Sequence, residues 1–447
     1  MANSYFICSN CGYKSSKWLG RCPECSSWNS LIEEYESKDN VKKKLSSGSS
    51  PVPLNNIKTD TYERINTNIS EFDRVLGGLI KGQTVFIGGE PGIGKSTLLL
   101  TIADNIANNK NINKIYFING EESETQIKER ASRLGINNSK IHLLNETEIN
   151  SLETILAKEK PEMIIIDSIQ TVYSSDINSP SGSISQIKET TSALVRIAKT
   201  LDIIMIIIGH IIKSGDFAGP KMIEHIVDTV ISLEIDFKGF YRILRCRKNR
   251  FASINEIGIF IMNEKGLIGV KETDSIFRQI HEGEVSGISI YPLVEGNRII
   301  PIEIQALVSR SQFNFPKRTT DGLDLNRLFM LVAIMEKKLK LSLNTYDIYL
   351  NITSGFDIKN PSADLAVIFA IYSSLKDIPY PEDIAITGEV GLTGEVRPSS
   401  ETEKIIQDIG RHSFKRLIIP YQNTLKANNK IELIPVKNIE EAIKIAF

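Results

Sequence analysis

The sequence predicts an α/β protein with three parts: a small cysteine-rich module, a core built on a mostly parallel β-sheet, and a C-terminal α+β region. The core is indicated by apolar runs such as residues 84–89, 163–168 and 203–210, which alternate with helical patterns. Continuous isoleucine and valine runs are typical of parallel strands that are buried on both faces. At 447 residues the chain is long enough for about three domains.

The composition is ordinary for a globular protein, with 41% hydrophobic residues, 24% charged residues and a net charge of −1. A strongly basic surface is thereby excluded, so contact with nucleic acid requires a local basic patch or repeated subunits. No apolar run reaches about 18 residues, and the first residues lack the apolar segment of a signal peptide. We therefore expect a cytoplasmic protein without a membrane partner.

Four cysteines near the start of the chain form two C-x2-C pairs with ten residues between the pairs. Each pair can supply two thiolates to one tetrahedral Zn²⁺. The alternative is a redox C-x-x-C motif, which usually occurs once and beside a strand–helix pattern. We predict a zinc finger over residues 1–33, in which Gly12 and Gly20 suit tight turns and Trp18 and Trp28 could cover the metal. Its expected ligands are Cys8, Cys11, Cys22 and Cys25.

Residues 34–56 are rich in serine, lysine and proline and contain almost no large apolar residue. Such a composition cannot bury a core, so we expect a flexible linker. The predicted core follows over residues 57–272, and the α+β region over residues 273–447 contains a long helix near 323–340.

A phosphate-binding loop is predicted at residues 88–97, whose sequence is GGEPGIGKST. It matches the G-x4-G-K-[ST] pattern, follows a strand and opens a helix, which is the context that the motif needs. Backbone amides there can hold phosphates at a helix N-terminus, Lys95 would reach the β and γ phosphates, and Ser96 would hold Mg²⁺. The expected ATP-binding residues are Gly89, Glu90, Pro91, Gly92, Ile93, Gly94, Lys95, Ser96 and Thr97, with Asp167.

Polar side chains end three of the predicted strands. Asp167 follows a buried strand and suits the Mg²⁺ shell, while Glu121 could polarise the attacking water as a general base. Alternatively, Glu121 or Glu122 only caps the next helix. His210 could sense the γ-phosphate, or it could be a hydrogen-bonded loop histidine.

The segment DIKNPSADLA, residues 357–366, resembles the part of Lon-type ATP-dependent proteases that carries the nucleophilic serine, here Ser362. In Lon the base is a lysine. Counted from Thr387, the lysine position falls on Glu403, and Lys404 is one residue further on, where a helix would turn it by about 100°. We therefore expect a Lon-like fold without proteolytic activity.

Together, the four-cysteine head, the motifs at 88–97, 119–123 and 164–171, and RKNRFAS at 247–253 resemble the bacterial RadA (Sms) family of recombination proteins. The resemblance covers nearly the whole chain. It implies a RecA-like P-loop ATPase core and a C-terminal Lon-protease-like domain. It also implies a homo-hexameric, DNA-dependent ATPase that translocates on single-stranded DNA and drives branch migration with RecA.

The motif at 247–253 departs from the family pattern Lys-Asn-Arg-Phe-Gly, because Ala252 stands where the family has glycine. Since alanine adopts positive φ poorly, either this turn is right-handed here or its geometry differs. In ring motors a cation from one subunit completes the neighbour's ATP site. We predict that Lys248 and Arg250 reach the γ-phosphate bound at Lys95 of the adjacent subunit; the alternative is an exposed basic turn.

Two segments would hold single-stranded or branched DNA in a RecA-like core, namely residues 173–186 and 211–221, both rich in glycine, serine and proline. Their candidate cations are Lys213 and Lys221, with Lys188 and Arg196 nearby. Few cations per subunit suffice if six subunits line one ring, although solvated surface lysines are the alternative. Two other functions compete with a DNA motor: a Lon-type serine protease and a regulatory ATPase that does not move along DNA.

Overall fold

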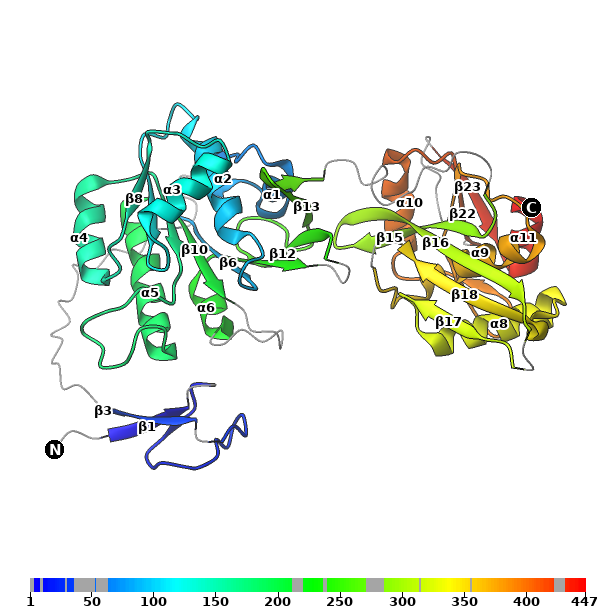
Figure 1. Cartoon of the computed structure of the whole chain (residues 1–447), viewed down its shortest axis with the longest axis horizontal. Coiled ribbons are helices and arrows are strands. Elements are labelled where there is room, and N and C mark those ends of the chain that lie inside the picture. The colour runs from blue at the N-terminus through cyan, green and yellow to red at the C-terminus, as the bar shows by residue number, and fades with distance from the viewer. Residues whose placement is uncertain are drawn as a thin grey trace. The chain divides into compact units, whose positions relative to one another are not determined.

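The computed structural model describes residues 4–8, 11–28, 30–35, 53, 63–210, 220–235, 239–270, 285–312, 315–353, 356–421 and 431–447 (Figure 1). The chain divides into two compact units. The first comprises Met1–Glu234 with Arg242–Gly269, and the second comprises Ile235–Tyr241 with Val270–Phe447. Most of the predicted linker at 34–56 lies outside the described residues.

The N-terminal module is a three-stranded antiparallel sheet in the order β2-β1-β3. Its strands are β1 (Ser4–Cys8), β2 (Lys14–Ser15) and β3 (Leu31–Tyr35). Ile7 pairs with Lys14 on one side and Ile32 on the other. Three buried side chains form its small core, namely Cys8, Cys22 and Leu31.

A nine-stranded sheet forms the centre of the first unit. The six strands from β11 to β8 run parallel to one another. In spatial order the strands are β14 (Gly266–Gly269), β13 (Ile257–Asn263), β12 (Tyr241–Asn249), β11 (Thr229–Ile235), β6 (Thr84–Gly89), β10 (Ile204–His210), β9 (Met163–Asp167), β7 (Ile115–Asn119) and β8 (Ile141–Leu144). A separate antiparallel pair precedes it, formed by β4 (Arg64–Ile65) and β5 (Leu79–Ile80).

Helices cover both faces of this sheet, as the isoleucine runs predict. Ile165 and Ile206 pack in one apolar cluster with α1, α2 and α3, while Ile164 and Ile207 pack in a second cluster with α4, α5 and α6. Successive strand residues point to opposite faces, so one run of isoleucines supplies both layers. The helices are α1 (Ser70–Leu76), α2 (Lys95–Ala107), α3 (Glu124–Arg133), α4 (Ile149–Glu159), α5 (Ile184–Leu201) and α6 (Pro220–Ile226).

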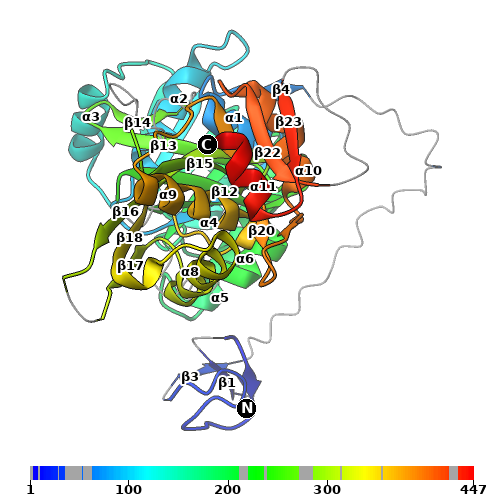
Figure 2. The ribbon, with the colours of Figure 1, turned by 90° about the vertical axis from the view of Figure 1, so that its right-hand side faces the viewer.

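The second unit is an α+β fold built around the buried helix α9 (Asp364–Lys376), whose residues from Leu365 to Ile371 are all buried. α9 packs on the mixed sheet β15 (Ile288–Glu295), β16 (Arg298–Arg310), β18 (Tyr346–Ile352) and β17 (Arg318–Asp321). A parallel sheet contains β19 (Ile384–Ile386), β22 (Arg416–Pro420) and β23 (Glu432–Val436), and a hairpin contains β20 (Glu389–Val390) and β21 (Val396–Arg397). The other helices are α8 (Leu325–Leu339), α10 (Thr402–Asp408) and α11 (Ile439–Ala446), which Figure 2 displays from the C-terminal side.

Among the described residues, no helix is both long enough and apolar enough to cross a lipid bilayer.

Candidate active site

The phosphate loop lies between the end of β6 and the start of α2, as the sequence predicts. Gly92 and Gly94 have φ angles of 75° and 109°. Residues with a side chain adopt such angles only at an energetic cost, so glycine is required at both turns. Gly94 precedes α2 and provides no side-chain cap. The first amides of this helix are therefore left to bind an anion, which the helix dipole also favours.

Lys95 is buried at the first position of α2. Its Nζ donates hydrogen bonds to the carbonyl oxygens of Gly89 at 2.8 Å and Glu90 at 2.9 Å. Burial lowers the pKa of Lys95 to about 8, and the carboxylates of Asp167 and Glu121 act in the opposite direction. An ATP phosphate would supply the negative partner that this buried ammonium needs.

Asp167 ends β9 and is buried. Burial raises its pKa, while a hydrogen bond with Ser96 acts in the opposite direction. A buried carboxylate that desolvation disfavours, next to a hydroxyl at the start of α2, matches the oxygen ligands that Mg²⁺ prefers. The two side chains therefore fit the cation that the ATPase fold implies.

Glu121 follows β7 and faces the same cavity. Ser168 Oγ donates a hydrogen bond to its Oε1, and His210 Nε2 lies 3.2 Å from the same oxygen. The hydrogen bonds from His210 and Ser168 lower the pKa of Glu121 despite partial burial. Glu121 is therefore a carboxylate at neutral pH, as a base for water must be.

The capping alternative for Glu121 and Glu122 is not what the structure has. α3 is capped by Ser123, whose side chain accepts from the backbone N–H of Gln126 while Gln126 Oε1 accepts from the Ser123 N–H at 2.8 Å. This reciprocal pair is a capping box. Both glutamates are thereby left for other contacts.

His210 connects the phosphate loop with the candidate base. Its Nδ1 lies 3.4 Å from Lys95 Nζ, and its Nε2 faces Glu121. Since a lysine ammonium can only donate, Nδ1 is the acceptor and Nε2 carries the proton that is donated to Glu121. The His210 ring therefore bridges the ammonium group of Lys95 and the carboxylate of Glu121.

Lys95, Glu121, Asp167 and His210 line a cavity of about 700 Å³. Arg130 lines it too, although the sequence did not predict this. Arg130 Nη2 lies 2.5 Å from Glu122 Oε1. Arg130 Nη1 is buried and has no hydrogen-bond partner. A buried guanidinium nitrogen without an acceptor is costly, so an anionic ligand in the cavity would stabilise it. A polar helix with an arginine is too common a pattern to reveal this in the sequence.

The hairpin of β13 and β14 covers the other wall of the cavity. A Cβ atom on Gly94 would lie 2.5 Å from Met262 Cε and 3.1 Å from Leu267 Cδ1. Gly94 is therefore required twice, for its φ angle and for this close approach.

Lys248 and Arg250 lie at the other end of the strands from the phosphate loop, near the first residues of β6 and β11. Arg250 Nη1 is 3.2 Å from Asp228 Oδ1, and Asp228 Oδ2 accepts from the N–H and Oγ1 of Thr84, the first residue of β6. The phosphate loop follows Gly89, the last residue of β6. At ~3.3 Å per residue, the strand from Thr84 to Gly89 spans about 17 Å, which separates the phosphate loop from the Asp228 contact. Lys248 Nζ donates to the carbonyl oxygens of Glu224 and Val227, at the end of α6.

Ala252 is not among the described residues with positive φ, so the backbone at this position is not left-handed. Its methyl group fills space beside Gly77: a Cβ atom on Gly77 would lie 2.9 Å from Ala252 Cβ. The departure from the family glycine therefore needs no left-handed backbone at this position.

Of the two candidate DNA segments, the structure describes only residues 173–186 in full. Most of residues 211–221 lies outside the described residues, including Lys213 and the side chain of Lys221. The segment 173–186, expected to be a mobile loop, is held by the buried side chain of Gln186. Its Oε1 accepts from the N–H of Ser174 at 2.9 Å, and its Nε2 donates to the carbonyl oxygens of Ser174, Ile177 and Ser179.

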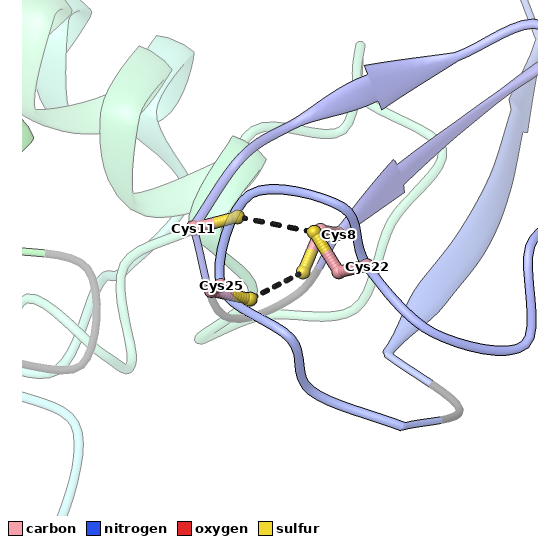
Figure 3. A group of neighbouring side chains, drawn as sticks. All are labelled: Cys8, Cys11, Cys22 and Cys25. Carbon is pink, nitrogen blue, oxygen red and sulfur yellow. Dashed lines mark hydrogen bonds between the residues drawn. The ribbon is translucent and has the colours of Figure 1, made fainter.

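The four N-terminal cysteines come together as the spacing predicts (Figure 3). Their Sγ atoms all lie within 4.8 Å of one another, with 3.5 Å between Cys11 and Cys22 and 3.6 Å between Cys8 and Cys25. A tetrahedral zinc with Zn–S bonds of about 2.3 Å separates its sulfurs by about 3.8 Å, so the donor set fits Zn²⁺. Gly12 has a φ of 75°, as a tight turn requires. The tryptophans do not cover the site, because Trp18 is 55% exposed and Trp28 is 72% exposed.

Ser362 is buried just before α9, in a short 3-10 turn. Its Oγ lies 2.5 Å from Tyr291 Oη and 3.4 Å from Glu401 Oε2. Glu401, and not Glu403 as counted from the sequence, is the carboxylate that faces this serine. Lys404 Nζ donates instead to the Gly296 carbonyl and to Asn297 Oδ1, so it points away as expected.

Fold and site together define a class of protein: a P-loop ATPase with a four-cysteine zinc ribbon before it and a Lon-type domain after it. Family models agree with each part. A rubredoxin metal binding domain matches residues 6–33, an AAA domain matches residues 51–216, and the C-terminal proteolytic domain of Lon protease (S16) matches residues 283–447.

Full-length relatives identify the family. The DNA repair protein RadA of Bacillus subtilis (strain 168) is 44% identical over 99% of this chain and 98% of its own length. The proteins of that name from Aquifex aeolicus and Listeria monocytogenes are 41% and 40% identical, each with 99% of this chain and 98% of the relative covered. The chain belongs to the RadA family of DNA repair proteins. A KaiC-like protein from Pyrococcus horikoshii OT3, of known structure, is 20% identical and covers 47% of this chain and 99% of its own, with a TM-score of 0.40.

Proposed function

We propose that this chain is a DNA-dependent ATPase that forms a homo-hexameric ring, translocates on single-stranded DNA and promotes branch migration of recombination intermediates with RecA. The main observation that supports this proposal is that the chain's charged groups lie in two separate places. Lys95, Glu121 and Asp167 gather in one cavity, while Lys248 and Arg250 lie at the other end of the strands of the same sheet. Such an arrangement suits a ring, in which one subunit's cations complete the neighbour's ATP site.

In the proposed reaction, the amides of the phosphate loop and Lys95 hold the β and γ phosphates. Glu121 orients the attacking water and accepts its proton, and His210 keeps Glu121 ionised. Mg²⁺, when bound by Ser96 and Asp167, would neutralise charge on the phosphate oxygens. Arg130 presents Nη1 to the same oxygens from the wall of the cavity.

The Lon-type protease is the weaker candidate because, in the part of the chain that the structure describes, no lysine is a hydrogen-bond partner of Ser362. Its hydroxyl partners are Tyr291 and Glu401, and Lys404 points elsewhere. Burial raises the pKa of Tyr291, so its phenol stays protonated and cannot take the serine proton. We therefore propose that the second unit is a scaffold without peptidase activity.

ATP hydrolysis with and without single-stranded DNA tests this function, followed by branch migration with purified protein and RecA. We expect DNA to stimulate hydrolysis, Lys95→Ala to abolish it, and Glu121→Gln to retain ATP binding while losing about 100-fold or more in rate. Stimulated hydrolysis without any strand movement would indicate a regulatory ATPase instead. Casein cleavage that depends on Ser362 would indicate a protease.

A further inference from the structure

The zinc ribbon carries two large aromatic side chains on its surface. Trp18 and Trp28, the chain's only tryptophans, are 55% and 72% exposed. A tryptophan can bury about 150–250 Å² of surface, so leaving two of them in water forgoes much of the apolar burial that a module of this size has available. Exposed aromatic groups of this kind are typical of binding surfaces.

The two indoles lie side by side, with a glycine between them. A Cβ atom on Gly20 would lie 3.7 Å from Trp18 Cη2 and 4.0 Å from Trp28 Cζ3. Gly20 is not among the described residues with positive φ, so the backbone does not require glycine there. A side chain at position 20 would contact both rings, so glycine leaves the rings uncovered at this point.

One cation, Arg21, lies against this pair. Arg21 lies over the Trp28 ring at 5.8 Å from its centroid, and its Nε donates to the Ser26 carbonyl, which fixes the guanidinium. Between residues 11 and 28 the charged side chains are Lys14, Lys17 and Arg21 against Glu24. A zinc ion with four thiolates carries a net charge of about −2, which offsets these cations, so the ribbon is not a strongly basic surface.

We propose that Trp18, Trp28 and Arg21 form a stacking platform for the unpaired bases of single-stranded nucleic acid. Flat rings beside a fixed guanidinium stack on any base, whereas phosphates would be held by three cations at most. Binding here is therefore tolerant of sequence and depends weakly on salt. This inference rests on the proposed DNA function, which it extends to a contact outside the ATPase core.

The test uses the emission of the two tryptophans in the full-length, zinc-loaded protein, because no other residue contributes tryptophan fluorescence. The protein is titrated with a labelled dT oligonucleotide and with an abasic oligonucleotide of equal length, and binding is followed separately by anisotropy of the label. We expect the dT strand to quench the emission by at least about one third and the abasic strand to quench it several-fold less.

Variants of the ribbon test which side chains are responsible for the quenching of the tryptophan emission. Gly20→Ala, which a Cβ contact of 3.7 Å tolerates, should weaken quenching, and Arg21→Ala should weaken it further. Ile32→Ala, at an exposed apolar position of the same ribbon, is the matched control and should leave quenching unchanged. Zinc content, measured for each variant, reports whether the ribbon is intact, and the wild-type titration stands whether or not the variants fold.

Three results would overturn the platform. Binding of dT seen by anisotropy without any emission change would leave the DNA function standing and would assign the indoles to another occupant, such as a protein. Equal quenching by the abasic strand would mean that the surface senses phosphates and not bases. Absence of any binding to single-stranded DNA would remove both the platform and the proposed motor function.

Discussion

Tyr291 Oη lies 2.5 Å from Ser362 Oγ in the interior of the second unit. The neutral phenol and the nearby Glu401 fill the surroundings of this serine with groups that hold it but do not activate it. Ser362 is thus a member of a buried hydrogen-bonded group, and we propose that its role is structural.

Ser362→Ala should therefore leave ATP hydrolysis and DNA binding within about twofold of the wild type. The variant loses one buried hydrogen bond and leaves Tyr291 Oη with a poorer partner, which costs about 1–3 kcal/mol of stability. Thermal unfolding and ATPase rates of the same preparation measure both effects. Tyr291→Phe is the matched variant and should cost a similar amount. A folded Ser362→Ala protein that has lost DNA activity would contradict this account.

His210 should set the acid limit of ATP hydrolysis through Glu121. The hydrogen bonds from His210 and Ser168 hold the pKa of Glu121 below its ordinary value of 4.5, so the carboxylate form persists as pH falls. His210→Ala removes the hydrogen bond that lowers this pKa the most, so the pKa of Glu121 rises in the variant. We expect the acid limb of the kcat/KM profile to move to higher pH in this variant, with a smaller move in Ser168→Ala.

The control for that profile is His142→Ala, since His142 lies on β8 against Tyr116 and outside the nucleotide cavity. Its acid limb should coincide with that of the wild type. An unchanged limb in His210→Ala would show that Glu121 is not the group whose protonation limits the reaction.

Arg130→Ala should weaken ATP binding by roughly tenfold or more, because hydrogen bonds to charged groups contribute about 1.5–3 kcal/mol. Titration with a fluorescent ATP analogue measures the loss directly, and comparison with the ADP analogue shows whether the γ-phosphate is involved. Lys128→Ala lies on the same helix and outside the cavity, so it serves as the control. Equal affinity of Arg130→Ala and wild type would mean that Nη1 meets no phosphate.

Arg250→Ala and Lys95→Ala should each be inactive, and mixing them should restore part of the ATPase activity. In the proposed ring, mixed assemblies would contain some interfaces in which an intact Arg250 meets an intact Lys95 of the neighbour. Arg247→Ala, whose guanidinium pairs with Glu234 on β11, is the control and should hydrolyse ATP alone. If mixed rings form and remain inactive, Arg250 acts within its own subunit or on DNA.

Cys22→Ser should release about one zinc per chain and unfold the N-terminal ribbon, because its small core is built on Cys8, Cys22 and Leu31. The core over residues 63–270 has its own apolar clusters and should keep its ATP affinity. Metal analysis and ATP binding on the same sample measure both outcomes. Zinc-free protein with an ordered ribbon would contradict the tetrathiolate site.

The sequence predicted β6, β9 and β10 nearly to the residue, because long isoleucine runs such as 163–167 are bounded by polar groups that cannot continue a buried strand. The phosphate loop was predictable for a related reason: its glycines are required by φ angles that side chains avoid. Local chemistry alone determines both features.

Other features depend on contacts between distant residues, and the sequence gives little signal for them. Arg130 belongs to the cavity only because α3 packs beside the phosphate loop. Gln186 holds the segment 173–186 through hydrogen bonds that no motif marks. Counting from Thr387 selected Glu403, because a count cannot include the turn that brings Glu401 to Ser362.

The placement of Arg250 beside the first residue of β6 and of Lys95 after its last also has a consequence for dilution. In the proposed ring, each chain would supply Lys95 to its own ATP site and Arg250 to the neighbour's site, so the proposed reaction would belong to the assembly. Specific ATPase activity should then fall as the protein is diluted below the concentration at which subunits associate. A cell could adjust the motor through the amount of protein alone, without any dedicated inhibitor.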